Sequence, residues 1–506
     1  MAFLALVASW RLLLSYHETP LLMRGALIFG ASSLVACSST STSSGGSDAS
    51  APPPAAHRTD PAAVHVVGKA FRDGKGRQLL FRGYNAKVTT LFDVTFDDGR
   101  VPEETFPDLS ETEAARIEQL GWNVLRIPVS WSGLEPHPVQ YSAAFMAKLD
   151  TVLAKAAAHH FYVFVDMHQD GYSKEIGEDG QPLWAIVPPP TLLLQGPYID
   201  SRRLTQPVLQ AGFNFFTNTP ATDGRPLQNA YVEAAQQVVG HIVGNPVVLG
   251  YEAFNEPVVL HQDQLDAFHA IFGDAVHAVD ADAPVLFEPV GTRNQFDHTI
   301  VPAVPWSHGP GAYAVHIYTC WFSSCTPANW TTEDPSALAP SMASAEKERA
   351  GWGTPLIVTE FGCDQTLPQG PAWMSAELDL QDQYLASSTA WEFSGLGSWG
   401  FHDDAGNERP TTTHIMARMF PRAVAGTLLK IDRPKLGDMI VTYLAGSATN
   451  GLEHEVSLST EYVTSPKILC DGAATAFTQA TGRATFTCPL KDEGTHTFEV
   501  VGTPAQ

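Results

Sequence analysis

The sequence predicts an α/β protein in which a (β/α)8 TIM barrel is followed by a small antiparallel β-sandwich domain. Short apolar runs rich in Val, Ile, Leu and Phe alternate with helical patterns over most of the chain, as in a barrel. After residue 420 the pattern changes to short β-prone segments separated by Gly, Asp and Ser. A chain of 506 residues with 44% hydrophobic and 17% charged residues has room for both domains and is not mainly disordered.

Candidate strands carry the barrel prediction, because several are apolar on successive residues and so suit parallel strands buried on both faces. They span residues 79–85, 124–131, 162–168, 248–255, 285–288, 312–318, 356–360 and 396–401. A doubly wound open sheet is the alternative. We disfavour it because no Gly-rich phosphate-binding turn follows the first strand.

Candidate helices lie between these strands, the first of them after Ser110, a plausible N-cap. The predicted helices span residues 111–120, 143–159, 231–243, 264–279, 336–349 and 376–391. We therefore expect the barrel to occupy residues 62–420 and the sandwich residues 421–506. The sandwich strands are expected at 439–444, 453–457, 484–488 and 496–501.

The first 61 residues are expected to target the protein for export and tether it, and not to form part of the folded domains. Arg24 precedes a short apolar run, too short to span a bilayer, that ends in small residues before Cys37, so residues 1–36 are typical of a signal peptide. The stretch 34–37 resembles the lipobox of bacterial lipoproteins, in which the cysteine is acylated; the alternative is a plain signal peptide with an incidental cysteine. Residues 37–61, mostly Ser, Thr, Gly, Ala and Pro, predict a flexible tether.

The predicted signal peptide implies export to the bacterial cell envelope. The protein would be anchored there by a lipid on Cys37, or secreted if the lipobox interpretation is wrong. Export also permits disulfides. Cys470 and Cys488 are candidates for a pair within the small domain, and Cys320 and Cys325 for closing a short loop. Cys363 is then free, or competes for one of the latter two.

Charge and missing motifs exclude several classes of function. With 54 acidic against 30 basic residues, the net charge of −24 disfavours binding to nucleic acid and electrostatic adsorption to anionic membranes. The sequence has no His-Glu-x-x-His, Cys-x-x-Cys or calcium-loop motif, so we expect neither metal nor cofactor. A Gly-x-Ser-x-Gly elbow is also missing, which disfavours an esterase of the α/β-hydrolase type.

Polar and aromatic residues gather at the predicted carboxyl ends of the strands, where barrel enzymes hold their working groups. They are Arg126, Asp166, His168, Asp170, Asn255, Glu256, His316, Tyr318, Glu360 and Trp399. Glu256 and Glu360 end the fourth and seventh predicted strands, on opposite sides of a narrow mouth. Two carboxyl groups about 5–5.5 Å apart are what a retaining glycosidase needs.

Such a pair must ionise differently, one carboxyl staying protonated as an acid while the other stays charged as a nucleophile. Arg126 and Tyr318 are candidates for holding Glu360 ionised. Asn255, beside Glu256, is suited to the sugar 2-hydroxyl.

The chain resembles glycoside hydrolase family 5 of clan A in the motifs Asn-Glu-Pro at 255–257 and Thr-Glu-Phe-Gly at 359–362. The set of Arg126, His168, His316-x-Tyr318 and Trp399 completes this resemblance. Asn-Ala-Lys at 85–87 and Asp-Met-His-Gln-Asp at 166–170 are similar to the endoglycoceramidases within that family. Segments 171–229 and 319–335 depart from the family pattern.

The resemblance implies that Glu256 is the acid/base and Glu360 the nucleophile. It implies contacts to the sugar at the cleavage point from Lys87, His168, Asp170, Asn255, Tyr318 and Trp399. The implied substrate is a glycolipid, cut between its oligosaccharide and ceramide, and the lipid anchor adds the membrane as a partner. Alternatives are a β-glucan, β-mannan or steryl glucoside as substrate, or a non-catalytic carbohydrate-binding surface lipoprotein.

Plain structural roles compete with several of these assignments. The two glutamates could be buried ion-pair partners, Lys87 a solvated lysine, and Trp399 simple barrel packing. The apolar stretches 184–198 and 213–216 predict either a contact surface for a two-chain lipid or packing against a helix, and both readings stay open.

Overall fold

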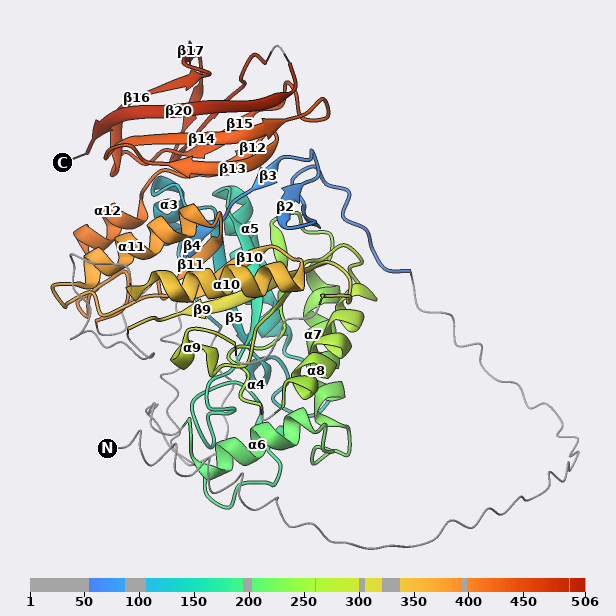
Figure 1. The fold of residues 1–506 in the computed structure, drawn as a ribbon. Coiled ribbons are helices and arrows are strands. Elements are labelled where there is room, and N and C mark those ends of the chain that lie inside the picture. The colour runs from blue at the N-terminus through green and yellow to red at the C-terminus, as the bar shows by residue number, and fades with distance from the viewer. Residues whose placement is uncertain are drawn as a thin grey trace, which may run out of the picture. The chain divides into compact units, whose positions relative to one another are not determined.

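The fold was analysed in a computed structural model that describes residues 54–86, 106–193, 203–259, 261–299, 305–320, 337–393, 398–490 and 492–505 (Figure 1). Residues 54–506 form one compact unit. Lys87, Cys37 and Cys325 lie outside the described residues, as do the signal peptide and nearly all of the tether.

A closed barrel of parallel strands forms the centre of this unit, which confirms the predicted fold class. Around the barrel the described strands are β4 (Arg82–Asn85), β5 (Val124–Ser130), β6 (Tyr162–His168), β7 (Val248–Glu252), β8 (Val285–Phe287), β9 (Gly311–Ile317), β10 (Leu356–Phe361) and β11 (Ser387–Ala390). β11 pairs with β4 through Ser388 and Arg82, and this pairing closes the ring.

The eighth barrel strand is not where the sequence predicts it. The strand predicted at 396–401 is wrong: residues 398–401 form a turn, and the barrel closes instead through β11. The helix predicted at 376–391 is also wrong at its end, because α11 stops at Gln383. The sequence Ser-Ser-Thr-Ala of β11 has no large apolar side chain, yet all four residues are buried and Ser388 N donates to Phe81 O over 2.9 Å. Barrel closure, rather than local hydrophobicity, therefore specifies this strand.

Helices flank the strands of the barrel in Figure 1. The longer ones are α3 (Glu111–Gln119), α5 (Ala143–Ala158), α6 (Gln206–Phe216), α7 (Leu227–Ile242), α8 (Gln262–His277), α10 (Ala339–Trp352) and α11 (Gly370–Gln383). Shorter ones are α4 (Trp131–Leu134), α9 (Arg293–Phe296), α12 (Pro410–Met416) and the 3-10 turn Leu183–Ala185. α3 begins with a capping box, in which Ser110 Oγ accepts from Glu113 N and Glu113 Oε2 accepts from Ser110 N. Among the described helices none is both long and apolar enough to cross a bilayer.

Strand periodicity separates an apolar floor from a polar rim inside the barrel. Side chains two residues apart share one face of a strand. Val124 and Phe164 belong to a buried apolar cluster with residues of the other strands. Arg126 follows Val124 by two residues in β5, and Asp166 and His168 continue the face of Phe164 in β6. The same step leads from Ala314 to His316 in β9, so polar groups gather towards the carboxyl ends of the strands. We call this polar end of the barrel, with Arg126, Asp166, His168 and His316, the rim.

Two antiparallel sheets make up the β-sandwich. One has the order β1-β2-β3-β12-β15-β19-β18 and the other β13-β14-β20-β16-β17. The bounds in the first sheet are β1 Val64–Val67, β2 Ala70–Asp73, β3 Gln78–Leu79, β12 Pro421–Val424, β15 His454–Ser457, β19 Arg483–Phe486 and β18 Thr478–Ala480. Those in the second are β13 Thr427–Asp432, β14 Asp438–Ala445, β20 Gly494–Pro504, β16 Val463–Cys470 and β17 Ala473–Thr475. Strand pairing thus crosses the boundary expected at residue 420, because β1–β3 precede the barrel in sequence.

The sandwich contacts the barrel away from the polar rim. Arg422, in β12, donates to the backbone oxygens of His160 and Gly121 over 2.6 and 3.4 Å. Both residues lie just before barrel strands, at their amino ends. These contacts therefore lie at the end of the barrel opposite the carboxyl-terminal rim.

Cysteines follow the sequence expectation where they are described. Cys470 and Cys488 form a disulfide within the sandwich. Cys320 is disulfide-bonded, and its predicted partner lies outside the described residues. Cys363 is a free, buried thiol whose Sγ donates to Gly370 O over 3.4 Å.

Candidate active site

Glu256 and Glu360 face each other at the rim of the barrel. Glu360 lies near the end of β10, and Glu256 lies four residues beyond the end of β7. An oxygen of each and a ring nitrogen of His316 all lie within 4.8 Å of one another. His316 Nδ1 is 2.8 Å from Glu256 Oε1 and 3.4 Å from Glu360 Oε2. This separation suits direct attack on a sugar by one carboxylate, and leaves too little room for the intervening water of an inverting enzyme.

Both oxygens of Glu360 accept hydrogen bonds from buried donors. Arg126 Nη1 donates to Oε1 over 2.5 Å, and the Tyr318 hydroxyl donates to Oε2 over 2.7 Å. Burial and the charge of Glu360 raise the pKa of Tyr318 well above its usual range, so the phenol keeps its proton. Donors on both oxygens stabilise the ionised carboxylate. The structure thus brings together the two residues that the sequence suggests for holding Glu360.

Arg126 is fully buried and joins further rim residues to Glu360. Its Nε donates to Glu252 over 2.6 Å, and its Nη2 lies 3.0 Å from Asp166. Nη1 and Nη2 donate to the side-chain oxygens of Asn85 and Asn255 over 2.9 and 2.8 Å. Burial opposes the charge, but the surrounding carboxylates, Asp166 first, raise the pKa of Arg126 well above its usual range. The guanidinium is therefore a permanent cation at the centre of the rim.

Glu256 lies in a different electrostatic environment from Glu360. Its Oε1 accepts a hydrogen bond from Asn294 Nδ2 over 2.6 Å, and its backbone N donates to Glu288 Oε2 over 3.1 Å. Burial, followed by the charge of Asp170, raises the pKa of Glu256 to about 7, although Arg203 acts in the opposite direction. A carboxyl with this pKa is protonated in about half of the molecules at neutral pH, which suits a general acid.

Buried neighbours complete the contrast between the two glutamates. Burial lowers the pKa of His316 to about 4, so its ring is neutral at pH 7. Burial and the neighbouring Glu252 raise the pKa of Glu288 well above its usual range, which favours the protonated form of this carboxyl. The neutral ring of His316 therefore lies between Glu256 and Glu360.

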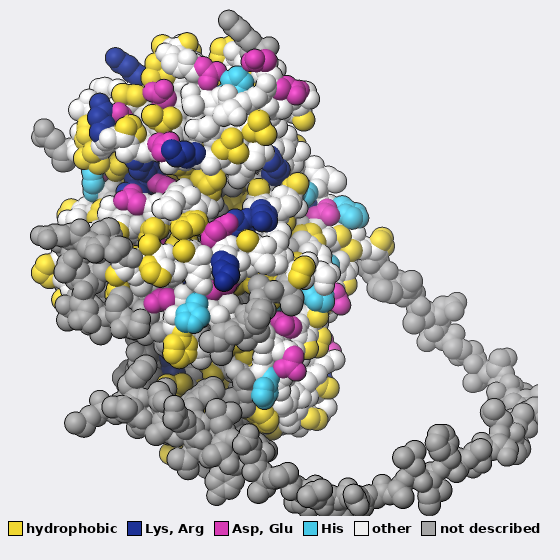
Figure 2. Space-filling view, viewed as in Figure 1, with side chains coloured by type: hydrophobic (Ala, Val, Ile, Leu, Met, Phe, Trp, Pro, Cys, Tyr) yellow, Lys and Arg dark blue, Asp and Glu magenta, His cyan; other side chains and the backbone are white. Residues whose placement is uncertain are grey.

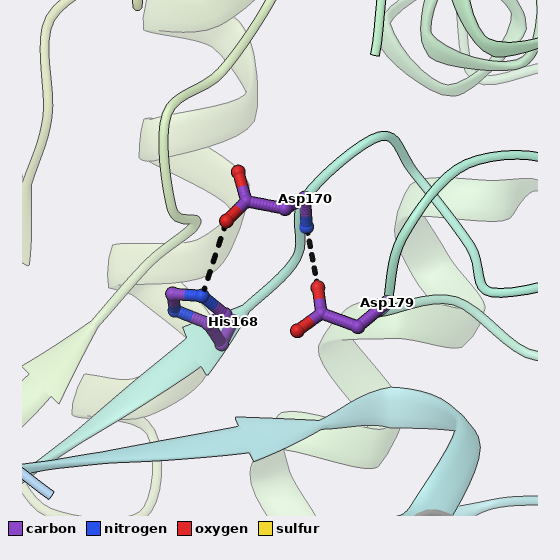
Figure 3. Close-up of side chains that lie close together, drawn as sticks. All are labelled: His168, Asp170 and Asp179. Carbon is purple, nitrogen blue, oxygen red and sulfur yellow. Dashed lines mark hydrogen bonds and ion pairs between the residues drawn. The ribbon is translucent and has the colours of Figure 1, made fainter. Parts of the chain in front are cut away.

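The side chains of His168, Asp170 and Asp179 lie close together where the chain leaves β6 (Figure 3). His168 Nδ1 is 2.5 Å from Asp166 Oδ2, and its Nε2 is 3.6 Å from Asp170 Oδ2. Asp170 N donates to Asp179 Oδ1 over 2.5 Å. Burial opposes protonation of His168, but the charge of Asp166 raises its pKa well above the usual range. His168 is thus a cation between two aspartates.

The remaining predicted residues that the structure describes, Asn255 and Trp399, lie at the rim, and their expected contacts to sugar stay predictions. The Asn255 amide is held by Arg126 and by Gln169, whose backbone oxygen accepts from Asn255 Nδ2 over 3.1 Å. Trp399 is half-buried in the turn after β11, with its ring centroid 5.8 Å from that of Tyr318.

Sequence reasoning missed several residues of the site, among them Glu252 and Asp179. Trp391 directly follows β11 and stacks on His168, with ring centroids 6.1 Å apart and planes 16° apart. A correct eighth strand would have placed Trp391 at the rim. Asn294, in α9, and Arg203, before α6, come from segments without a motif. Glu288, by contrast, ends the predicted fifth strand and could have been included.

Within the part of the chain that the structure describes, three groups of side chains have the donors and spacing to bind a metal ion. They are His168–Asp170–Asp179, Glu252–Glu288–His316 and Glu256–His316–Glu360. Each lies against an arginine: Arg203 is 3.1 Å from Asp170, and Arg126 is 2.6 Å from Glu252 and 2.5 Å from Glu360. A guanidinium thus already supplies the positive charge, and the absence of a metal or cofactor requirement stays a prediction.

Comparison with known proteins identifies the family. The family model of Cellulase (glycosyl hydrolase family 5) matches residues 95–397, more than half of the chain. The chain belongs to glycosyl hydrolase family 5. As the separation of Glu256 and Glu360 also indicates, this family-5 protein is a retaining glycoside hydrolase.

The proteins that this chain is similar to differ in how much of it they match. Endoglycoceramidase I of Rhodococcus hoagii is 27% identical over 387 residues, covering 70% of this chain and 71% of the relative. Ergosteryl-beta-glucosidase of Saccharomyces cerevisiae is 28% identical over 148 residues, covering 25% of this chain and 19% of the relative. The solved structure of endo-glycoceramidase II from Rhodococcus sp. in its ganglioside GM3 complex has a TM-score of 0.72 at 21% identity. It covers 86% of this chain and 100% of that chain, and it shows the shared fold.

We expect the pKa of Glu256 to set the alkaline limit of activity. Burial, then Asp170, raises this pKa to about 7. Since an acid must be protonated to donate, kcat/KM for a phenyl β-glycoside is expected to fall about tenfold per pH unit above this value. Rates measured across pH 5–9, with a dinitrophenyl glycoside for comparison, test this. Glu256→Gln should retain activity on the dinitrophenyl substrate, and its kcat/KM should no longer fall above pH 7 (the alkaline limb of the pH profile). A fall above pH 7 equal to that of the parent would contradict the assignment.

Proposed function

We propose that this chain is an endo-β-glycosidase that cleaves the bond between the oligosaccharide and the ceramide of glycosphingolipids. Glu360 attacks the anomeric carbon and forms a covalent glycosyl-enzyme, while Glu256 protonates the departing oxygen of the ceramide. Glu256 then takes a proton from water, which attacks the same carbon and releases the sugar with its configuration retained.

The contrast between the two carboxyl groups carries this proposal. Glu360 accepts hydrogen bonds from Arg126 and Tyr318 and is stabilised as the anion that a nucleophile must be. Glu256 has a pKa raised to about 7 by burial and by Asp170, which suits proton donation and return near neutral pH. A pair of structural ion-pair partners would not need such opposite environments.

Exposed apolar side chains near Glu256 support a lipid leaving group. Val258, two residues beyond Glu256, is 42% exposed, and Phe213 of α6 is 40% exposed. A side chain added at Gly212 would meet Val258 O at 3.6 Å, which places α6 beside this segment. Phe215 and Phe216 instead pack in the core against Phe254, so the packing alternative holds for these two. An apolar surface next to the acid suits an aglycone with hydrocarbon chains.

Extent of similarity favours ceramide over the other aglycones. The similarity to endoglycoceramidase I extends over 70% of this chain, whereas that to the ergosteryl glucosidase extends over 25%.

On the face in Figure 2, basic and acidic side chains are interspersed and no basic patch is seen among the described residues. This face therefore offers nothing that would favour a polyanionic substrate.

Digestion of defined substrates tests the activity. Lactosylceramide, galactosylceramide, cellohexaose and a steryl glucoside would be incubated with the purified protein and separated by thin-layer chromatography. We expect free ceramide together with intact lactose from lactosylceramide. Glu360→Gln should reduce this rate by at least about a thousandfold because it removes the nucleophile. Glu377→Gln, a change at another fully buried glutamate, serves as the control and should retain activity. Cello-oligomers or free sterol without ceramide would contradict the proposed substrate.

We further propose that the protein is exported and anchored by a lipid on Cys37. The short apolar segment before this cysteine and the Ser- and Thr-rich stretch after it support the proposal. An anchor of this kind would hold the barrel close to a membrane that contains its substrate.

Expression of the full chain in a bacterial host tests the anchor. The mature protein should fractionate with membranes, and mass spectrometry should find an acylated N-terminal peptide that begins at Cys37. Cys37→Ser should move the protein out of the membrane fraction. An unmodified Cys37, or membrane association of the serine variant equal to that of the parent, would contradict lipid anchoring.

A further inference from the structure

Arg203 lies among three acidic side chains at the mouth of the barrel. Its Nη2 is 3.1 Å from Asp170 Oδ2 and 2.8 Å from Glu178 Oε1, and its Nη1 is 3.6 Å from Glu256 Oε2. Nε also donates to Glu178. Arg203 precedes α6, within the segment that departs from the family pattern. Its side chain is one-third exposed, so the guanidinium lies at the border between the site and solvent.

The two oxygens of Glu256 have different neighbours. Oε1 is held by Asn294 and His316, over 2.6 and 2.8 Å. Oε2 lies near Arg203, at a distance too long for a hydrogen bond. Since no described residue donates to Oε2, this is the oxygen available to carry a proton towards a leaving group, and Arg203 acts on it through charge.

Opposing charges surround Glu256. Asp170 is an anion, because Arg203 and His168 outweigh its burial and lower its pKa. Its negative charge favours the protonated form of Glu256, whereas Arg203, His168 and Arg126 favour the ionised form. The other titratable groups that face this carboxyl, among the described residues, are Glu288, His316, Tyr318 and Glu360. Among these cations Arg203 is the exposed one, since Arg126 and His168 are fully buried.

We propose that Arg203 is a positioning residue for the acid Glu256, which holds Asp170 and Glu178 in place and adjusts by its positive charge how readily Glu256 releases its proton. Glu178 accepts hydrogen bonds from Nε and Nη2 of Arg203, whereas Nη1 is the nitrogen nearest Glu256. This buried carboxyl has a pKa raised to about 9 by burial and by Asp170, and its contact with Arg203 relieves part of that cost. The inference rests on Glu256 as the acid, and it does not depend on ceramide as the leaving group.

Loss of the Arg203 charge should move the alkaline limb of activity to higher pH. Without the cation, His168 still favours the ionised form of Asp170. Glu256 then loses a positive charge that favours its own ionised form while the negative charge of Asp170 remains, so Glu256 holds its proton more tightly. An opposite charge at this distance shifts a carboxyl pKa by about one unit or more. We expect the limb of kcat/KM for phenyl β-lactoside to rise by about one pH unit in Arg203→Gln and to stay near that of the parent in Arg203→Lys. The leaving group of dinitrophenyl β-lactoside needs little protonation. The pH dependence of kcat/KM for this substrate should therefore be the same in both variants as in the parent.

Arg225 offers a matched control. It too contacts three acidic side chains, Glu135, Asp223 and Glu233, over 2.7–2.8 Å, and none of these is a rim residue. Arg225→Gln should therefore leave the pH profile in place, while thermal unfolding of all variants reports folding. Should Arg203→Gln not fold, Arg203→Lys decides: its limb must follow the parent, and a shift of one unit despite the retained charge would overturn the proposal.

Two further results would overturn the inference. One is an unchanged limb in a folded Arg203→Gln protein, and the other is an equal shift in Arg225→Gln. Failure to release ceramide from lactosylceramide would instead count against the proposed substrate, because the aryl lactoside assay does not involve a lipid.

Discussion

A single buried guanidinium, that of Arg126, organises the polar rim of this barrel. It contacts Glu360, Glu252, Asp166, Asn85 and Asn255, which come from or directly follow four neighbouring or opposing strands. Removing one partner of a buried ion pair typically costs about 3–5 kcal/mol, since it leaves an uncompensated charge in the interior. The positions of Glu360 and Asn255 are thus fixed by the same charge that the fold must satisfy.

The apolar floor of the barrel explains why this charge lies at one end. Val124 and Phe164 fill the interior near the amino ends, and the face of each strand turns polar only two residues further on. The sandwich contacts the amino-terminal side of the barrel through Arg422. The rim is therefore left to the loops that follow the strands, where substrate can approach. Glu256 and Arg203 both lie on such loops, whereas Glu360 lies within β10, so the two glutamates have different environments.

Much of this arrangement could be predicted from the sequence because a barrel has few ways to place its strand ends. β6 was predicted at its observed bounds, since its apolar run is long and ends in a charged stretch. The proximity of Glu256 and Glu360 followed from two strands on opposite sides of one ring. β11 could not be predicted in the same way, because its small polar residues carry no hydrophobic pattern, and Trp391 was missed with it. The pairing of β3 with β12 is a contact distant in sequence, and local patterns do not reveal it. Arg203 was missed for a related reason: its role depends on the path of a long segment whose sequence shows no periodicity.

The central claim is that Glu360 forms a bond to the sugar while Glu256 handles the proton. Trapping the covalent intermediate tests it most directly. The protein would be incubated with an activated 2-deoxy-2-fluoro β-lactoside, whose fluorine slows release of the intermediate, and its peptides would be examined by mass spectrometry. We expect one fluorolactosyl group per chain, on the peptide that contains Glu360, and no label in Glu360→Gln. A label on Glu256, or turnover without any covalent adduct, would contradict this account.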